Sequence, residues 1–387
     1  MVRVTAGLAE PPVARPVRGR RHSTSHANLL HRVDGPTALD RLDAIIVPSA
    51  RQTAYLSYAL RLGQQLDCPV VALCSLRASA EGALRAAKRL GAHLIATDVP
   101  ERVNLPTFAT SGLPADPRFR RKGDLSLKRN IGLALSRMLG WNRVAFLDDD
   151  IRSVRPDDMR AAAGLLDRFS MVGLGNAGFP DNSVVCHALR EVGVPQETFV
   201  GGGAMVVPAG RTTTFFPDVY NEDWFFLLDE DGLSRTAVTG TMHQEPYDPF
   251  RTTERARAEE FGDCLAEGIY ALLDEGGTVA DADLAFWADF LEDRRVMVDR
   301  ILAAIPGCDK SPEEKRRMTE AMRASHGRRK FITPEHCVGY LSALADDRAL
   351  WRSRVEELPK DLGVRKALAH LGLNTTYLFQ PWRGRRD

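Results

Sequence analysis

Short hydrophobic runs alternate with helical patterns through the first part of the chain. The runs are bounded by charged or turn-forming residues, which is typical of buried strands, and they cover residues 43–49, 68–74 and 94–97. Apolar positions also recur at helical spacing over three segments, which are residues 53–66, 79–90 and 127–138. Strands that are separated by helices predict a parallel sheet with right-handed crossovers.

A fourth strand is predicted where the run Val144–Leu147 ends in three aspartates, Asp148, Asp149 and Asp150. Side chains alternate along a strand, so Asp148 and Asp150 are expected on one side and Asp149 on the other. Neighbouring carboxylates repel each other and favour a hard divalent cation. Ligands of open α/β sheets bind beyond the carboxyl ends of the strands. The motif therefore predicts a metal that holds a phosphorylated ligand; the alternative is three solvated aspartates that start a loop.

The remainder of the chain changes character after the acidic motif. Residues 169–250 contain shorter apolar runs and more glycine, whereas the pattern beyond residue 251 is helical to the end. The helical candidates are residues 253–273, 280–305, 312–325 and 334–358. Residues 1–39 carry arginines among Pro, Ser, Gly and His without apolar periodicity, and they predict a flexible basic tail.

Composition removes several classes of function. The 387 residues include 52 basic and 51 acidic ones, so no global charge favours nucleic acid or an anionic membrane as a partner. The six cysteines form no Cys-x-x-Cys pair, which argues against a zinc ribbon and suits a reducing, cytoplasmic location. No apolar run approaches the length of a membrane span, and none follows the N-terminal arginines as a secretory signal would require.

Two further motifs suit a phosphorylated ligand. Lys128, Arg129 and Asn130 place two cations and an amide at a predicted helix start, and cations and helix N-termini both favour phosphate. Three glycines, Gly201–Gly203, precede an apolar run and allow a ligand to approach the backbone closely. The alternatives are a solvated helix face for the first motif and an ordinary turn for the second.

Two more motifs suit catalysis and metal binding. Glu222 and Asp223 stand next to Trp224, so a carboxylate in a partly apolar setting could act as a general base beside an aromatic wall for a sugar ring. The alternative is the acidic first turn of a helix. His243 could supply a nitrogen ligand to the same metal, although a lone histidine is more often structural.

Taken in order along the chain, these motifs resemble those of the GT-A nucleotide-sugar glycosyltransferases, closest in style to family 2. Ile45–Pro48 resembles the opening strand, and Lys128-Arg129-Asn130-x-Gly132 resembles the Arg-Asn-x-Gly helix. The three aspartates lie where the family has its Asp-x-Asp motif. Gly201–Gly203, called the glycine loop below, resembles the acceptor-side loop, and Glu222-Asp223 resembles the catalytic pair. The resemblance covers residues 40–250.

The resemblance implies an α/β GT-A fold, in which a Rossmann-like, mixed but mainly parallel sheet is flanked by helices. The nucleotide half would span residues 40–150, the acceptor half 151–250, and an all-α extension 251–387. The implied activity is metal-dependent transfer of a sugar from a nucleotide-diphosphate donor, such as a UDP- or GDP-sugar, to a hydroxyl of a small-molecule acceptor. Inversion is preferred, but retention stays open because retaining GT-A enzymes also use a metal-binding histidine. A homodimer through the C-terminal helices is possible.

The resemblance also implies roles for individual residues. Asp223 would be the base, helped by Glu222, and Mn²⁺ or Mg²⁺ would be held by Asp150, Asp148 and His243. Asp148 would hold the ribose or a metal-bound water. The residues expected to bind the nucleotide sugar are Pro48, Ser49, Arg51, Asp98, Lys128, Arg129, Asn130, Asp148, Asp149, Gly202, Gly203 and Trp224. Asp98 is included because Cys74-Ser75 lacks the acidic residue that usually binds the base or ribose.

Two other functions remain open, and one motif is rejected. A sugar-phosphate nucleotidyltransferase would also use an α/β sheet and acidic metal ligands, but the loop Pro48–Gln52 lacks the glycines expected of that class. A non-catalytic nucleotide-binding or scaffold protein is the second alternative. The run Gly173–Gly178 fits G-x-G-x-x-G, yet Pro180 would break the helix that a dinucleotide fold needs there.

Overall fold

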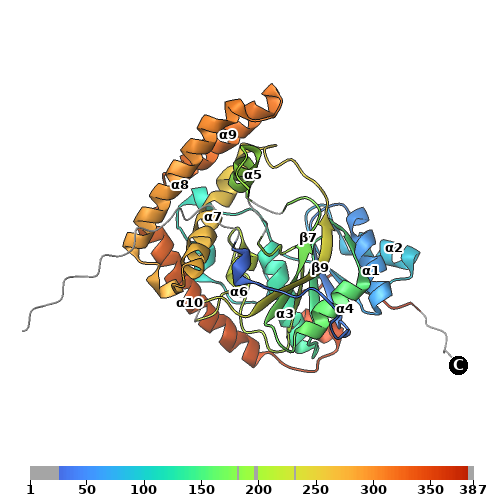
Figure 1. Ribbon diagram of the computed structural model, residues 1–387. Helices are drawn as coiled ribbons and strands as arrows, with labels where there is room; N and C mark the ends of the chain where they lie inside the picture. Colours follow the sequence, from blue (N-terminus) through green and yellow to red (C-terminus); the bar gives the residue numbers. More distant parts are fainter. Residues whose placement is uncertain (1–25, 181–182, 196–198, 231, 382–387) are drawn as a thin grey trace, which may run out of the picture.

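The computed structural model describes residues 26–180, 183–195, 199–230 and 232–381. Most of residues 1–39, the predicted tail, therefore lies outside the described residues. The described residues form a ten-stranded mixed sheet with helices packed around it (Figure 1). The strand order is β1-β9-β7-β8-β5-β2-β3-β4-β10, with β6 paired to β9.

The half of the sheet formed by β4, β3, β2 and β5 is parallel throughout. Its strands and helices are β2 (Ala44–Ser49), α1 (Ser57–Leu66), β3 (Val70–Cys74), α2 (Ala80–Leu90), β4 (Leu94–Asp98), α3 (Leu125–Met138) and β5 (Val144–Leu147). The order of elements that the hydrophobic pattern predicts is confirmed. Both ends of α2 carry ordinary capping residues, since the Ser79 hydroxyl accepts a hydrogen bond from the Gly82 amide and Gly91 ends the helix with φ +65°.

The other half of the sheet is mixed. The elements that follow β5 are β6 (Ile151–Val154), α4 (Pro156–Leu165), β7 (Met171–Asn176), α5 (Val184–Glu191), β8 (Ala204–Val207), α6 (Glu222–Leu227) and β9 (Thr236–Gln244). Strand β8 runs antiparallel to both β5 and β7, whereas β7 and β9 are parallel. The Gly173–Gly178 run lies in β7 and the turn after it, and no helix begins inside it, as Pro180 predicted.

Both faces of the sheet are buried. Ile46 on β2 belongs to one hydrophobic core and its neighbours Ile45 and Val47 to a second one, because successive side chains point to opposite faces. Helices α1, α2 and α4 contribute to the second core, and α3 and most of the C-terminal helices to the first. This two-sided burial explains why the parallel strands read as continuous apolar runs.

The region after residue 251 is mainly helical. Its elements are α7 (Thr253–Asp274), α8 (Leu284–Ala304), α9 (Pro312–Arg329), α10 (Pro334–Glu357) and α11 (Val364–His370). Ser311 and Thr333 form capping boxes directly before the N-terminal prolines of α9 and α10. In Figure 1, α7 to α10 lie on the left, on the opposite side of the molecule from α1 and α2.

The prediction of an all-α region to the end of the chain is wrong at its last element. Strand β10 (Thr376–Phe379) pairs antiparallel with β4 and closes that edge of the sheet. Its β-branched and aromatic residues are a strand signal that the sequence interpretation passed over. At the opposite edge, β1 (His31–Arg32) pairs with β9 and His26 is buried, so this described part of the predicted tail is ordered.

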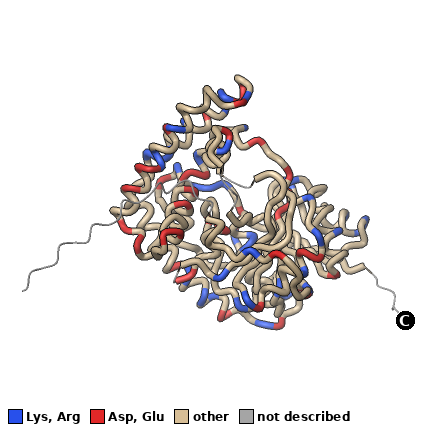
Figure 2. Tube along the Cα trace, viewed as in Figure 1, with Lys and Arg blue, Asp and Glu red and all other residues tan. Residues whose placement is uncertain are grey.

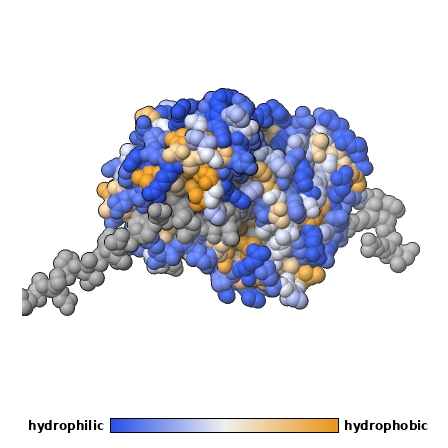
Figure 3. All heavy atoms as spheres, turned by 45° about the horizontal axis from the view of Figure 1, so that its top comes forward, coloured by the Kyte–Doolittle hydropathy of each residue, from blue (hydrophilic) through white to orange (hydrophobic). Residues whose placement is uncertain are grey.

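The surface agrees with the balanced composition. Acidic and basic positions are interspersed along the trace in Figure 2. The face seen in Figure 3 is mostly hydrophilic, with several separate hydrophobic patches. Exposed large hydrophobic residues on or beside the C-terminal helices include Leu284, Phe331 and Leu350. None of the described helices is both long and apolar enough to cross a membrane.

Candidate active site at the acidic turn

Asp148, Asp149 and Asp150 form a turn, called the acidic turn below, between β5 and β6. Strand β5 ends at Leu147, because its ladder with β8 runs only from Val144 to Leu147. The turn is closed by a hydrogen bond of 3.2 Å from the Ile151 amide to the Asp148 carbonyl. Strand alternation therefore does not apply to the aspartates. It gives no reason to group Asp148 with Asp150, and the structure joins Asp149 and Asp150 through one arginine.

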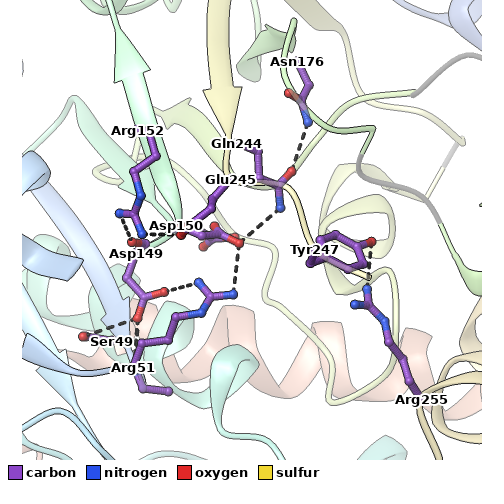
Figure 4. A network of polar contacts seen from close by, with 12 residues as sticks. Ser49, Arg51, Asp149, Asp150, Arg152, Asn176, Gln244, Glu245, Tyr247 and Arg255 are labelled. Carbon is purple, nitrogen blue, oxygen red and sulfur yellow. Dashed lines mark hydrogen bonds and ion pairs between the residues drawn. The ribbon is translucent and has the colours of Figure 1, made fainter. Parts of the chain in front are cut away.

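Asp149 and Asp150 share one arginine (Figure 4). The Arg51 guanidinium donates to Asp149 Oδ1 at 2.5 Å and to Asp150 Oδ2 at 3.1 Å. Arg51 follows the carboxyl end of β2, which lies next to β5 in the sheet. Strand order thus brings together charges that are about a hundred residues apart. The charges on Asp149 and Asp150 raise the pKa of Arg51 against the lowering effect of burial, so the guanidinium stays protonated.

The two carboxylates are also held by groups other than this guanidinium. Asp149 Oδ2 accepts hydrogen bonds from the backbone amides of Ala50 and Arg51 at 3.1 and 3.2 Å. Asp150 Oδ2 accepts from the Gln244 amide at 3.3 Å, and Asn176 in turn donates to Gln244 at 3.0 Å. Figure 4 shows this chain of contacts leading from the acidic turn to β7 and β9. Both carboxylates are therefore oriented by the fold itself.

Asp148 is bound by a second arginine, Arg129. The Arg129 guanidinium donates to Asp148 Oδ1 at 3.0 Å, to Glu222 Oε1 at 2.9 Å and to the Gly202 carbonyl at 2.9 Å. It also lies over the Phe216 ring at 5.3 Å, and the residue is 1% exposed. The structure therefore brings together four of the predicted site residues, which lie on α3, the acidic turn, the glycine loop and α6.

Asp223 lies against the glycine loop. A Cβ atom at Gly202 would stand 2.7 Å from Asp223 Oδ2, so only glycine permits this approach. Trp224, the next residue on α6, packs at 4.8 Å from the Phe199 ring and 4.9 Å from the Tyr270 ring. Trp224 is thus part of an internal aromatic cluster. Because the residue is partly buried, it offers less surface to a sugar than expected.

Three other predicted residues support the scaffold. Lys128 is buried, and its Nζ donates to the Ser49 carbonyl at 2.9 Å and to Ser75 Oγ at 2.7 Å, joining the ends of β2 and β3. The Asn130 amide exchanges two hydrogen bonds of 2.8 Å with the backbone of Phe216. Asp98 accepts a hydrogen bond from the Ala80 amide at 2.7 Å, at the start of α2.

A cavity of about 1040 Å³ opens beside the carboxyl ends of β3 and β4. Ser75 and Leu76 line it from one side, and residues 99–111 and 122–127 contribute most of the remaining wall. Lys128 connects the cavity to the acidic turn, because it donates both to Ser75, which lines the cavity, and to Ser49, which contacts Asp149 at 3.5 Å. Pro48 is buried near the end of β2, at the same edge of the sheet.

His243 is not brought to the acidic turn. It is exposed on β9, and alternation turns its neighbour Gln244 inward, where the Gln244 side chain reaches Asp150. The sequence interpretation chose His243 by residue type, whereas the strand's register with β6 selected the next residue. Burial alternates only over the last residues of β9, from Thr241 to Gln244, so the apolar Met242 was the sequence signal that places Gln244 on the inward side.

The acidic turn offers part of a ligand set for a divalent ion. The predicted ligand set is not assembled, because Asp148 is bound to Arg129 and His243 faces outward. Asp149 and Asp150 nevertheless offer carboxylate oxygens, which suit Mn²⁺ or Mg²⁺, and the Arg51 guanidinium between them is a stand-in cation. These two residues therefore fit a divalent ion in exchange for Arg51.

A second cluster of possible ligand atoms lies away from this turn. Among the described residues, Cys186, Asp263 and Glu267 place one ligand atom each within 4.8 Å of the others, and all three are buried. Asp263 is already paired with the buried Arg294 at 2.6 Å. Burial also raises the pKa of the Cys186 thiol well above its ordinary value, which disfavours the thiolate that a metal would bind.

The chain was compared with known proteins. It matches no protein-family model and no curated protein sequence. Among solved structures it is similar to the mannosyltransferase PcManGT from Pyrobaculum calidifontis in complex with GDP-Man and Mn²⁺. The two are 13% identical with a TM-score of 0.41, over 82% of this chain and 91% of that chain. At this level of similarity, the function has to be inferred from the residues of this chain.

Proposed function

We propose that the protein is a GT-A-type glycosyltransferase that moves a sugar from a nucleotide diphosphate to an acceptor hydroxyl. The observation that carries the proposal is the Arg129 clamp, which joins Asp148 of the acidic turn to Glu222 of the Glu222-Asp223 pair. A donor-side acid cluster and an acceptor-side base then border one site. The 1040 Å³ cavity beside β3 and β4 supports the proposal, because it is large enough for a nucleoside.

On the acceptor side, Asp223 is the general base. Its carboxylate takes the proton of the acceptor hydroxyl as the oxygen attacks the anomeric carbon, and the bond from that carbon to the diphosphate breaks. Gly202 sets the position of Asp223, because no larger residue fits beside its carboxylate. Arg129 holds Glu222 and thereby the first turn of α6. A direct displacement of this kind inverts the anomeric centre.

On the donor side, the departing diphosphate accumulates negative charge. Arg51 is the half-exposed cation at this end of the sheet, and Lys128 fixes the strand ends that frame the cavity. A divalent ion held by Asp149 and Asp150 would neutralise the diphosphate as a Lewis acid. The nucleoside would occupy the cavity, whose wall includes Ser75 and the loop after Asp98.

The test is a binding screen of the full chain with GDP, UDP and ADP, each with and without Mn²⁺. A ligand that binds the folded state raises the melting temperature by mass action. We expect one nucleoside diphosphate to raise it, and the matching nucleotide sugar to be consumed with release of that nucleotide. Failure of all the nucleotides to bind would contradict the proposal. Release of pyrophosphate from a nucleoside triphosphate and a sugar phosphate would instead identify a nucleotidyltransferase.

A further inference from the structure

Arg51 and its two partners differ in how firmly the structure holds them. The side chains of Asp149 and Asp150 are 6% and 10% exposed, whereas that of Arg51 is 46% exposed. Backbone amides and Gln244 keep both carboxylates in place without the guanidinium. A long, half-exposed side chain loses little when it leaves an ion pair, because water replaces its contacts. The guanidinium is therefore the member of this group whose contacts water can replace most readily.

We propose that Arg51 is a displaceable internal cation. A divalent ion and the Arg51 guanidinium are alternative partners of the same Asp149–Asp150 carboxylates, and arrival of the ion releases Arg51 to bind the donor diphosphate. This inference rests on the proposed function for the identity of the anion, but the competition between ion and guanidinium does not depend on it.

The exchange has a clear electrostatic reason. One guanidinium carries a single charge and leaves the two carboxylates with a net negative charge, which repels a diphosphate. A divalent ion in the same place cancels both carboxylate charges, and the released guanidinium then adds a positive charge with the planar donor geometry that suits phosphate oxygens. Arg51 is suited to this because it lies two residues beyond Ser49, the carboxyl end of β2, at the edge of the sheet that also borders the cavity.

The experiment measures two affinities of Arg51→Met that should change in opposite directions. The first is the affinity for Mn²⁺ alone, by titration calorimetry or from the electron paramagnetic resonance of free Mn²⁺. It should rise about tenfold because the competing cation is gone. The second is the affinity for GDP and UDP at saturating Mn²⁺. It should fall about tenfold because one charge-assisted contact to the phosphates is lost.

Arg152→Met is the matched control. Arg152 also flanks the acidic turn and lies over the same Tyr55 ring as Arg51, at 4.3 Å against 5.7 Å. It donates to the backbone carbonyl of Asp149 and to Glu245, at 3.0 and 2.5 Å, rather than to the two carboxylates. Loss of its charge should change the Mn²⁺ affinity by less than about threefold. An equal gain in Mn²⁺ affinity in both variants would show that loss of any nearby positive charge has this effect, and it would overturn the proposed exchange.

The remaining outcomes are also decisive. Unchanged or weaker Mn²⁺ binding by Arg51→Met would overturn the proposal, because the guanidinium would then not compete. If that variant does not fold, Arg51→Lys keeps the charge but cannot bridge two carboxylates, and it should still bind Mn²⁺ several-fold more tightly than the wild type. A wild-type protein that binds no nucleotide would refute the proposed function, while the Mn²⁺ comparison would still decide the competition.

Discussion

The two arginines at the acidic turn have the same chemistry and opposite settings. Arg129 is enclosed, with its side chain 2% exposed, and it serves two carboxylates and a backbone carbonyl on three segments of the chain. Arg51 is 46% exposed and serves two carboxylates of one turn that are anchored without it. The difference teaches that burial, rather than residue type, decides whether an arginine is a fixed structural contact or a cation that can be exchanged.

The largest expected effect is on stability. Arg129→Met leaves the Asp148 and Glu222 carboxylates without their guanidinium, and breaking a buried pair on one side costs about 3–5 kcal/mol of unfolding free energy. Arg51→Met should cost less, about 1 kcal/mol, because the guanidinium is 46% exposed and because backbone amides and Gln244 still hold the two buried carboxylates. Urea denaturation of the two variants measures both values, and similar losses would remove the distinction drawn between the arginines.

Substitutions on the acceptor side and on the donor side should have different effects on turnover and on ligand binding. Asp223→Asn removes the base and should lower kcat at least about a hundredfold, with little change in nucleotide affinity. Asp149→Asn should instead weaken Mn²⁺ and nucleotide binding. Steady-state kinetics and calorimetry on both variants check this division. Normal turnover by Asp223→Asn would exclude it as the base.

The free energy of unfolding should also depend on pH, through the buried His26. Burial alone lowers the pKa of His26, but its hydrogen bonds to Asp274 and Glu267 and their charges outweigh this and raise it to about 9. The folded state thus binds the proton more tightly than the unfolded one. This contribution, up to about 3 kcal/mol, is complete below pH 6.5 and is lost as the pH rises towards 9. Urea denaturation at pH 6.5 and 9.5 should show a smaller loss for His26→Gln than for the wild type. Equal losses would contradict the assignment.

The smallest effect concerns the position of the base. Gly202→Ala puts a Cβ against the Asp223 carboxylate and should lower kcat about tenfold, while nucleotide affinity is kept. Gly203→Ala is the control, because its Cβ would meet Ile151 Cδ1 at 3.0 Å and the side chain of Met242, which can shift. An effect of Gly203→Ala on kcat as large as that of Gly202→Ala would argue against a specific role for the Gly202 contact.

Much of the fold could be predicted from local patterns. The strand–helix order from β2 to β5, the cap at Ser79 and the starts of α9 and α10 at proline follow from periodicity and capping, which act over a few residues. Strand β10 was missed because its local signal covers only four residues and its partner strand lies almost three hundred residues earlier in the chain. The ordered segment around His26 was missed for the same reason, since its partners lie on α7.

The sequence by itself determined which chemical groups are available: three consecutive aspartates after a buried strand, a basic helix, a glycine loop and an acidic pair. Only the tertiary structure decided how they are grouped. The length of the β5–β8 ladder ends the strand before Asp148, and the register of β9 turns Gln244 rather than His243 inward. Strand order places Arg51 between Asp149 and Asp150. These outcomes depend on pairing between distant segments, whose free energy comes from contacts that no local window contains.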